Sequence, residues 1–347
     1  MEVPYSRTIA GDLPWYSVLI VTGIMLAVWL GGKEERRIGL PEDTVVDLSL
    51  IAVPFGIVGA RLYYVLMKWE LFAPDPISVL YIWQGGIGIY GAVIGGMLGA
   101  WLYARKKGLR FLKLADALMP GVLLAQSIGR WGNYFNMEAY GLRITEPRLQ
   151  FFPLAVWIPA ENAWHAATFF YESLWNAAGF AILWKIRRKK HVDGWILAWY
   201  LLLYGSGRFV IEQLRTDSLY IGAFKASQWL SFVLCAGAAL FLMKCAEQKR
   251  GRLIAETVLI VLCLTRWLAL DANGIYAVLM ITIGVMGMWL CRHNRVSIGW
   301  LCAALTLDVI GLLAAVSGYP YEPLAQGVHA ALCSLTLPMS VWALCGR

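Results

Sequence analysis

The chain has 347 residues, of which 59% are hydrophobic and only 15% are charged, and its mean hydropathy is +0.61. An average soluble domain is about 25% charged, so this composition excludes an ordinary soluble globular protein. Apolar runs of about 18–23 residues recur along the chain, and this length spans a bilayer. The sequence therefore predicts an all-α polytopic membrane protein.

The apolar runs predict a seven-span core followed by about four additional C-terminal spans. The core spans lie near residues 14–31, 45–67, 79–103, 115–135, 168–184, 195–214 and 226–243. The other four lie near residues 253–270, 274–291, 297–317 and 325–344. We therefore divide the chain into a membrane core, residues 1–250, and an appended hydrophobic region, residues 251–347. For the appended region we expect packing or partner docking, with a separate activity as the alternative.

The net charge of +8 is concentrated in short loops that follow every second core span. These loops carry more than half of the 30 Lys and Arg residues, in the segments 33–37, 105–113, 185–190 and 244–252. The positive-inside rule places them in the cytoplasm, with the N-terminus outside and the C-terminus cytoplasmic. The charge thus indicates membrane orientation, and we expect no nucleic-acid partner.

The first span begins at an aromatic segment, Pro14-Trp15-Tyr16-Ser17. Residues 1–13 lack the apolar run and cleavage site of a signal peptide, so we expect this span to remain as an anchor. Tyr16 is a candidate site residue, although aromatic side chains at the membrane interface commonly serve only as anchors.

A glycine-rich stretch, residues 83–91, opens the third span. Gly91, Gly95 and Gly99 have the spacing of close helix–helix packing. The Gly85-Gly86 pair predicts a re-entrant break, which membranes tolerate where the backbone lines a cavity or is buried in protein. Tyr90 would project near this break.

Four polar side chains lie within ten residues at the outer end of the fourth span: Arg130, Asn133, Asn136 and Glu138. Charged groups in membrane segments are costly and normally face a partner or a cavity. A structural Arg–Glu pair is the simpler alternative, but it would not require the two asparagines. The long connection from Asn136 to Ala167 follows this group, so we expect a site that opens outward.

The sixth span carries Tyr204, Arg208 and Glu212 at intervals of four residues, so the three share one helical face. An ion pair within this helix is the simple reading of Arg208 and Glu212. Together with Arg130 and Glu138, we expect two arginines and two carboxylates to converge on one pocket.

All seven cysteines lie in or after the seventh span, and none has Cys-x-x-Cys spacing. This pattern argues against a disulfide framework, and we expect neither a metal site nor a cofactor. The first 234 residues contain no thiol, so chemistry there that needs a sulfur nucleophile must take it from a substrate. His165, the outer histidine of the core, is expected to be structural.

Several segments together resemble the prolipoprotein diacylglyceryl transferase family over about residues 10–245. The thirteen residues from Gly129 to Gly141 are similar to its signature. The other matching segments, in order, are Trp15-Tyr16, residues 83–91, Tyr171-Glu172-Ser173 and Arg208-x-x-x-Glu212. Departures occur at Tyr90, where many members have histidine, and around His165, where the spacing and a following proline differ.

The resemblance implies transfer of the diacylglyceryl group from phosphatidylglycerol to the lipobox cysteine of a prolipoprotein. A thioether forms and glycerol phosphate leaves. The partners would be phosphatidylglycerol, lipobox-bearing prolipoproteins and membrane lipid, and the location the bacterial cytoplasmic (inner) membrane.

The residue types suit this chemistry. Arginine offers a planar fork of permanent charge to phosphate oxygens, so Arg130 is the first choice for the lipid phosphate. We expect Arg208, oriented by Glu212, to stabilise charge in the transition state. The remaining expected substrate-binding residues are Asn133, Asn136 and Glu138 around the glycerol head, with Gly141, Tyr16 and Tyr204.

The proton acceptor stays open at this point. Tyrosine titrates near about 10 and is a poor base at neutral pH. Tyr90 is therefore either activated by a nearby arginine or only orients the substrate while Glu212 or another group accepts the proton.

A membrane transporter of an anionic or lipid substrate is the alternative function. Transporters also place charges in mid-membrane and often show inverted repeats. We find no convincing repeat between residues 1–120 and 121–245. A non-catalytic scaffold would not need the polar group at residues 130–138.

Overall fold

A computed structural model of the chain describes residues 7–9, 11, 13–216, 220–221 and 224–245. The four predicted C-terminal spans lie outside these residues. The described part is mostly helical and divides into two compact units. One unit comprises the residues up to Gly23 and from Leu123 onward, and the other comprises Ile24–Val122.

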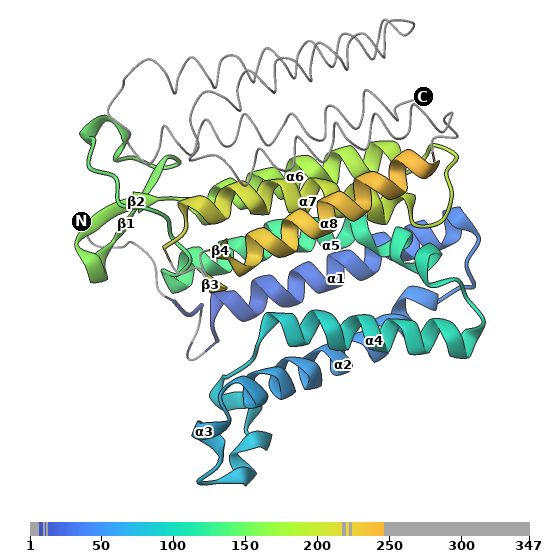
Figure 1. Cartoon of the computed structure of the whole chain (residues 1–347), viewed down its shortest axis with the longest axis horizontal. Coiled ribbons are helices and arrows are strands. Elements are labelled where there is room, and N and C mark those ends of the chain that lie inside the picture. Colours follow the sequence, from blue (N-terminus) through green and yellow to red (C-terminus); the bar gives the residue numbers. More distant parts are fainter. Residues whose placement is uncertain (1–6, 10, 12, 217–219, 222–223, 246–347) are drawn as a thin grey trace, which may run out of the picture. The chain divides into compact units, whose positions relative to one another are not determined.

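The unit of residues 24–122 is built on two long helices joined by an irregular segment (Figure 1). It contains most of α1 (Trp15–Ile38), then α2 (Thr44–Met67), α3 (Trp69–Phe72), α4 (Ile89–Lys107) and the start of α5 (Phe111–Asn136). Two 3-10 turns, Pro76–Leu80 and Ile82–Gln84, link α3 to α4. The buried Glu35 carboxylate accepts a hydrogen bond of 2.7 Å from the Val45 backbone N–H, which joins the end of α1 to the start of α2.

Close packing of α2 against α4 depends on small residues, as the glycine spacing predicted. A Cβ added at Gly95 would lie 3.2 Å from the Gly59 Cα, and one at Gly99 would lie 2.9 Å from the Phe55 Cβ. Larger side chains would force the helices apart. The packing prediction for this stretch is confirmed.

The start of α4 differs from the predicted span, because residues 79–88 are not part of that helix. Gly85 and Gly86 have φ values of 85° and 74°, in the left-handed region that disfavours side chains. Arg61 of α2 holds this segment in place. Its guanidinium donates five hydrogen bonds of 2.6–3.3 Å to the carbonyl groups of Ser78, Val79, Tyr81, Gly85 and Gly86.

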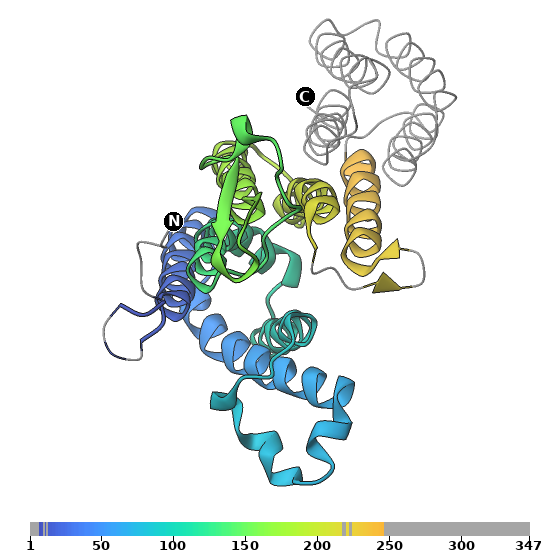
Figure 2. The ribbon, with the colours of Figure 1, turned by 90° about the vertical axis from the view of Figure 1, so that its left-hand side faces the viewer.

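The other unit contains the rest of α5 with α6 (Thr168–Ile186), α7 (Trp195–Leu214) and α8 (Ala226–Cys245). Helix α7 lies between α6 and α8 (Figure 2). Trp175 of α6 donates from Nε1 to the Leu203 carbonyl of α7 at 2.7 Å. A Cβ at Gly207 would strike the same indole, so the α6–α7 contact needs glycine there.

The all-α prediction needs a correction in this unit, which contains two antiparallel β-hairpins. Strands β1 (Ala155–Ile158) and β2 (Ala163–Ala166) pair with Trp157 opposite Trp164, across the 3-10 turn Pro159–Glu161. A further turn, Pro147–Leu149, precedes them, and β3 (Tyr220–Ile221) pairs with β4 (Phe224–Lys225). Strands this short, set between prolines, lack the periodic run that identifies a strand in sequence.

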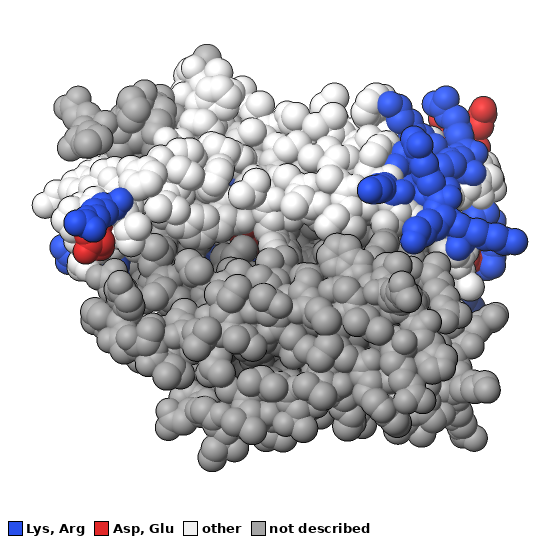
Figure 3. Space-filling model, turned by 90° about the horizontal axis from the view of Figure 1, so that it is seen from above, with Lys and Arg blue, Asp and Glu red and all other residues white. Residues whose placement is uncertain are grey.

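Three of the described helices, α1, α2 and α5, are long and apolar enough to cross a membrane. The seven-span count remains a prediction. On the face seen in Figure 3, Lys and Arg side chains gather mainly at one end, and most of the remaining described surface is uncharged. The run from Lys185 to Lys190, one of the predicted basic segments, begins in the last turn of α6 and continues into the loop before α7.

Candidate active site

Charged side chains from three helices meet within the unit that contains α5, α6 and α7. The Arg130 Nη2 atom of α5 lies 2.6 Å from Glu172 Oε1 of α6. Arg208 of α7 lies 3.2 Å from the other oxygen of Glu172 and 2.7 Å from Glu212 Oε2. Glu172 thus bridges both arginines. We refer to Arg130, Glu172, Arg208 and Glu212 as the arginine–glutamate cluster.

Within the cluster, the carboxylates are more deeply buried than the guanidinium groups. The side chains of Glu172 and Glu212 are each 3% exposed, whereas those of Arg130 and Arg208 are 21% and 16% exposed. Buried charge is tolerated when it is paired, so the glutamates fix the arginines in place. The arginines keep accessible edges that can bind a further anion such as phosphate.

Two tyrosines adjoin this cluster. Tyr204 lies one turn before Arg208 on α7 and is close to Arg130. The ring of Tyr16 on α1 covers Gly132, and Tyr16 lies near the charged side chains of Arg130 and Glu138. Its neighbour Trp15 stacks on Phe135 with ring centroids 5.0 Å apart, which holds the first turn of α1 on the end of α5.

The polar residues after Arg130 form a tight turn at the end of α5. Arg130 donates to Asn133 Oδ1 at 3.4 Å. Glu138 Oε1 accepts from Asn133 Nδ2 at 2.9 Å and from Asn136 Nδ2 at 3.3 Å. Met137 and Ala139, on either side of Glu138, have φ values of 55° and 56°, a conformation that costs energy in residues with a Cβ. The strained turn directs Glu138 back over the helix end.

Gly141 joins this turn to the β1–β2 hairpin and to the end of α7. Its N–H bonds the Ala166 carbonyl at 2.9 Å, and a Cβ would lie 2.9 Å from the Leu214 carbonyl oxygen. His165 places Nδ1 2.8 Å from the Gly141 carbonyl and Nε2 3.0 Å from Glu161. His165 thus has the structural position that we expected, and Gly141 is required by close packing.

The structure brings together Arg130, Arg208 and Glu212, as we expected, and Tyr204 shares the α7 face that the four-residue spacing predicted. Glu172, rather than Glu138, supplies the second carboxylate at the arginines. Sequence reasoning quoted Glu172 only as part of a resemblance. The signal that could have found it is an acidic residue near the start of a mostly apolar predicted span.

Tyr90 belongs to the unit of residues 24–122, in the first turn of α4. Its ring centroid lies 6.0 Å from that of Tyr63 on α2. Its predicted catalytic role stays a prediction.

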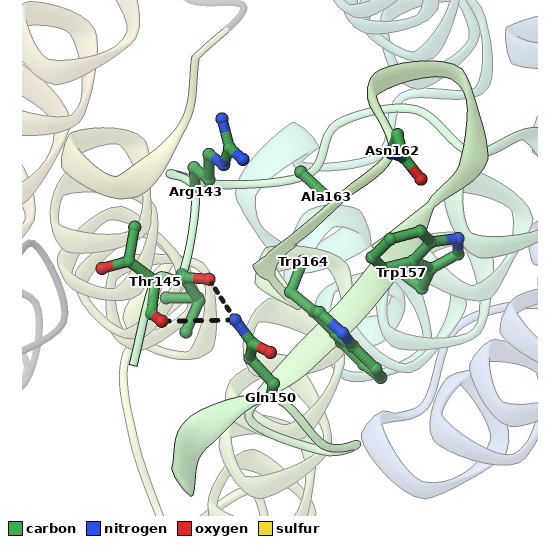
Figure 4. A pocket seen from close by; sticks show the side chains of 8 residues that line it. Arg143, Thr145, Gln150, Trp157, Asn162, Ala163 and Trp164 are labelled. Atoms are coloured by element: carbon green, nitrogen blue, oxygen red, sulfur yellow. Dashed lines mark hydrogen bonds between the residues drawn. The ribbon is translucent and has the colours of Figure 1, made fainter. Parts of the chain in front are cut away.

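The β1–β2 hairpin carries a separate hollow of about 280 Å³ (Figure 4). Trp157 and Trp164 line it, with ring centroids 5.8 Å apart. Gln150 donates across it to the Ile144 and Thr145 carbonyls at 3.0 and 3.4 Å. None of the candidate site residues lines this hollow, so it is distinct from the arginine–glutamate cluster.

Comparison with known families identifies the part of the chain that holds these residues. Residues 6–244 match the family model of the prolipoprotein diacylglyceryl transferases. The chain belongs to this family. A phosphatidylglycerol–prolipoprotein diacylglyceryl transferase of Bacillus cereus is 42% identical over 242 residues, which cover 69% of this chain and 89% of the relative. A relative of the same name from Bacillus anthracis shows the same identity and coverage.

The region shared with the diacylglyceryl transferases contains every candidate site residue, and the appended hydrophobic region lies beyond it. Within the described part of the chain, no three His, Cys, Asp or Glu side chains gather as metal ligands would.

Proposed function

We propose that this transferase moves the diacylglyceryl group of phosphatidylglycerol to the lipobox cysteine thiol of prolipoproteins. Membership of the family and the names of the Bacillus relatives support this reaction. The observation that carries the assignment to a site is the pair of partly exposed arginines bridged by buried Glu172.

The proposed step exchanges a carbon–oxygen bond for a carbon–sulfur bond. The substrate thiolate bonds to the glycerol carbon while the bond from that carbon to the phosphate oxygen breaks. The electron pair leaves with glycerol phosphate, so negative charge grows on the phosphate. Donors placed in advance where charge develops lower the barrier.

The arginine–glutamate cluster is suited to this task. Arg130 is proposed to bind the lipid phosphate, and Arg208, held by Glu212 at 2.7 Å, to stabilise the charge on the leaving group. Because Glu172 contacts both arginines, it sets the separation of their guanidinium groups. Asn133, Asn136 and Glu138 are proposed to orient the glycerol part of the donor.

The thiol proton requires an acceptor, and two candidates remain from the sequence. Tyr90 is one, and Glu212 is the other. Glu212 is buried and lies 2.7 Å from Arg208, a position that suits an orienting group. Positive charge from the arginines would also favour the substrate thiolate.

We further propose that the protein lies in the bacterial cytoplasmic membrane, with the N-terminus outside. The alternation of basic loops supports this orientation. In the proposed orientation, the end of α5 and the β1–β2 hairpin would face the side where prolipoproteins emerge.

The test uses purified full-length protein, phosphatidylglycerol and a lipobox peptide, with the thioether product detected by mass spectrometry. We expect Arg130→Ala to abolish transfer while retaining the wild-type chromatographic profile. Arg148→Ala, an exposed arginine in the outer connection, serves as the control and should keep full activity.

The possible outcomes separate site from function. Full activity of Arg130→Ala would remove Arg130 from the site. If the wild type transfers nothing but proteoliposomes take up a labelled anionic lipid, the transporter alternative replaces the enzyme.

A further inference from the structure

The turn that follows α5 carries Glu138 on a short piece of irregular backbone. Its first half is tied to α5, because the Glu138 N–H bonds the Asn133 carbonyl at 3.0 Å. Glu138 is exposed, so packing of its side chain contributes little to its position. The position of this carboxylate therefore depends on the backbone of the turn.

The second half of the turn is held by Thr168, the first residue of α6. Its Oγ1 donates to the Ala139 carbonyl at 2.6 Å. A Cβ built on Gly141 would lie 2.8 Å from the Thr168 γ-methyl, so this methyl packs on the glycine. Thr168 is 1% exposed, and both contacts therefore lie in the protein interior on its side. One side chain thus holds the turn before and after Tyr140.

The conformation of the turn requires such a contact. Met137 and Ala139 have φ values of 55° and 56°, which residues with a Cβ rarely adopt. Backbone of this kind persists only where the surrounding structure holds it. Without the bond from Thr168, we expect Ala139 to relax toward a negative φ value. This change would turn the neighbouring Glu138 relative to the end of α5.

The helix that holds the turn also holds the arginine–glutamate cluster. Thr168 and Glu172 are four residues apart on α6, so they share one helical face. Glu172 lies 2.6 Å from Arg130 and 3.2 Å from Arg208. Four residues of helix rise about 6 Å. This face of α6 therefore sets the separation between the turn that carries Glu138 and the two arginines.

We propose that Thr168 is a positioning residue for the transfer reaction. It holds the turn at Ala139, so that Glu138 keeps its place relative to the two arginines. This inference rests on the proposed function, in which Glu138 orients part of the donor. Thr168 itself touches no substrate and acts through the turn. Loss of its hydroxyl should therefore lower kcat more than it raises KM, because a misplaced group weakens alignment of the reacting atoms.

The test compares two substitutions of Thr168 with the wild type. Thr168→Val keeps the shape of the side chain and removes the hydroxyl, whereas Thr168→Ser keeps the hydroxyl. With phosphatidylglycerol and a lipobox peptide, we expect kcat to fall about tenfold in Thr168→Val and to stay within about twofold of the wild type in Thr168→Ser. KM for either substrate should change less than kcat.

The chain offers a matched control at Thr44, the first residue of α2 in the other compact unit. Thr44 is 2% exposed, and its Oγ1 donates to the Pro41 carbonyl at 2.7 Å. Thr44→Val removes the same kind of bond as Thr168→Val. It should lower the unfolding temperature by a similar amount and leave kcat unchanged. A general loss of stability would instead slow both variants.

A second measurement does not depend on catalysis. Amide hydrogen exchange, followed by mass spectrometry, reports local opening of the backbone in residues 137–141. We expect faster exchange there in Thr168→Val than in the wild type, in Thr168→Ser or in Thr44→Val. Exchange within α7 should be the same in all four proteins.

Several results would overturn the proposal. Unchanged exchange in Thr168→Val would show that the hydroxyl does not hold the turn. Faster exchange with an unchanged kcat would show that the turn moves without effect on the reaction. A loss of kcat in Thr168→Ser as large as in Thr168→Val would also contradict it, because the hydroxyl remains. If the wild type transfers nothing, the proposed function fails and the positioning role with it, while exchange still shows whether Thr168 holds the turn.

Discussion

The two compact units hold their arginines in different ways. Arg61, in the unit of residues 24–122, directs its five N–H donors at backbone carbonyl groups. Arg130 and Arg208, in the other unit, are held mainly by the carboxylates of Glu172 and Glu212. Carbonyl groups cannot be released without unfolding the loop that carries them. A side-chain carboxylate can be exchanged for another anion by rotation of a few bonds.

The difference indicates a structural role for Arg61 and an anion-binding role for Arg130 and Arg208. Arg61 is 6% exposed and has used its donors. The side chains of Arg130 and Arg208 stay 21% and 16% exposed.

The largest effect is expected at Arg208, where a lysine keeps the charge but loses the planar fork. Lysine cannot contact Glu172 and Glu212 with the geometry of Arg208, so charge on the leaving group would be poorly stabilised. Arg208→Lys should lower the initial rate of diacylglyceryl transfer by at least about 100-fold. Arg148→Lys is the matched control. A rate above half of the wild type would show that only charge is needed.

Tyr90→Phe tests whether the unit of residues 24–122 takes part in the reaction as well as in the structure. If the hydroxyl takes part in proton transfer, the rate should fall by about 100-fold. Tyr63→Phe, a change in the ring neighbour of Tyr90, should leave the rate near that of the wild type. Equal rates for Tyr90→Phe and the wild type would remove the hydroxyl from the mechanism.

Glu172→Gln tests whether a carboxylate-held arginine can exchange its partner. Loss of one charge from a buried pair should cost about 3 kcal/mol of unfolding free energy. Glycerol phosphate should then raise the unfolding temperature of the variant more than that of the wild type. Glu42→Gln, at an exposed position, provides the control. A smaller ligand-induced shift in Glu172→Gln would contradict exchange.

Arg61→Lys should have the smallest effect, and it should fall on stability. Lysine has three donors in place of five, so about two hydrogen bonds are lost, a cost of about 2 kcal/mol. Limited proteolysis should cut residues 74–88 faster than in the wild type. The thermal shift with glycerol phosphate should stay unchanged, and a large change would show that Arg61 also binds the anion.

Local patterns predicted much of this architecture. Long apolar runs located the helices of the described part, and the four-residue spacing predicted the pair of Arg208 with Glu212. The glycine spacing predicted a close helix–helix contact, which the structure has between α2 and α4 at Gly95. Each of these depends on neighbours within one helix or on the size of a side chain.

The missed features depend on contacts between distant segments. Glu172 meets Arg130 and Arg208 across 42 and 36 residues of sequence, which only helix packing decides. The hairpin of β1 and β2 has four-residue strands, too short for a clear alternation. The role of Arg61 was not visible in the sequence, because its partners are backbone carbonyl groups and not acidic side chains.

The extended segment around Gly141 has a consequence for engineering. Antiparallel pairing fixes which face each residue presents, so an insertion of one residue between Gly141 and Ile144 would reverse the side chains that follow. Such an insertion would also break the bonds to Ala166 and Leu214. The turn at Pro159–Glu161 closes the hairpin at the opposite end from these bonds. An affinity tag or fluorescent label inserted there should leave the pairing intact, which makes this turn the preferred attachment point for experiments on intact membranes.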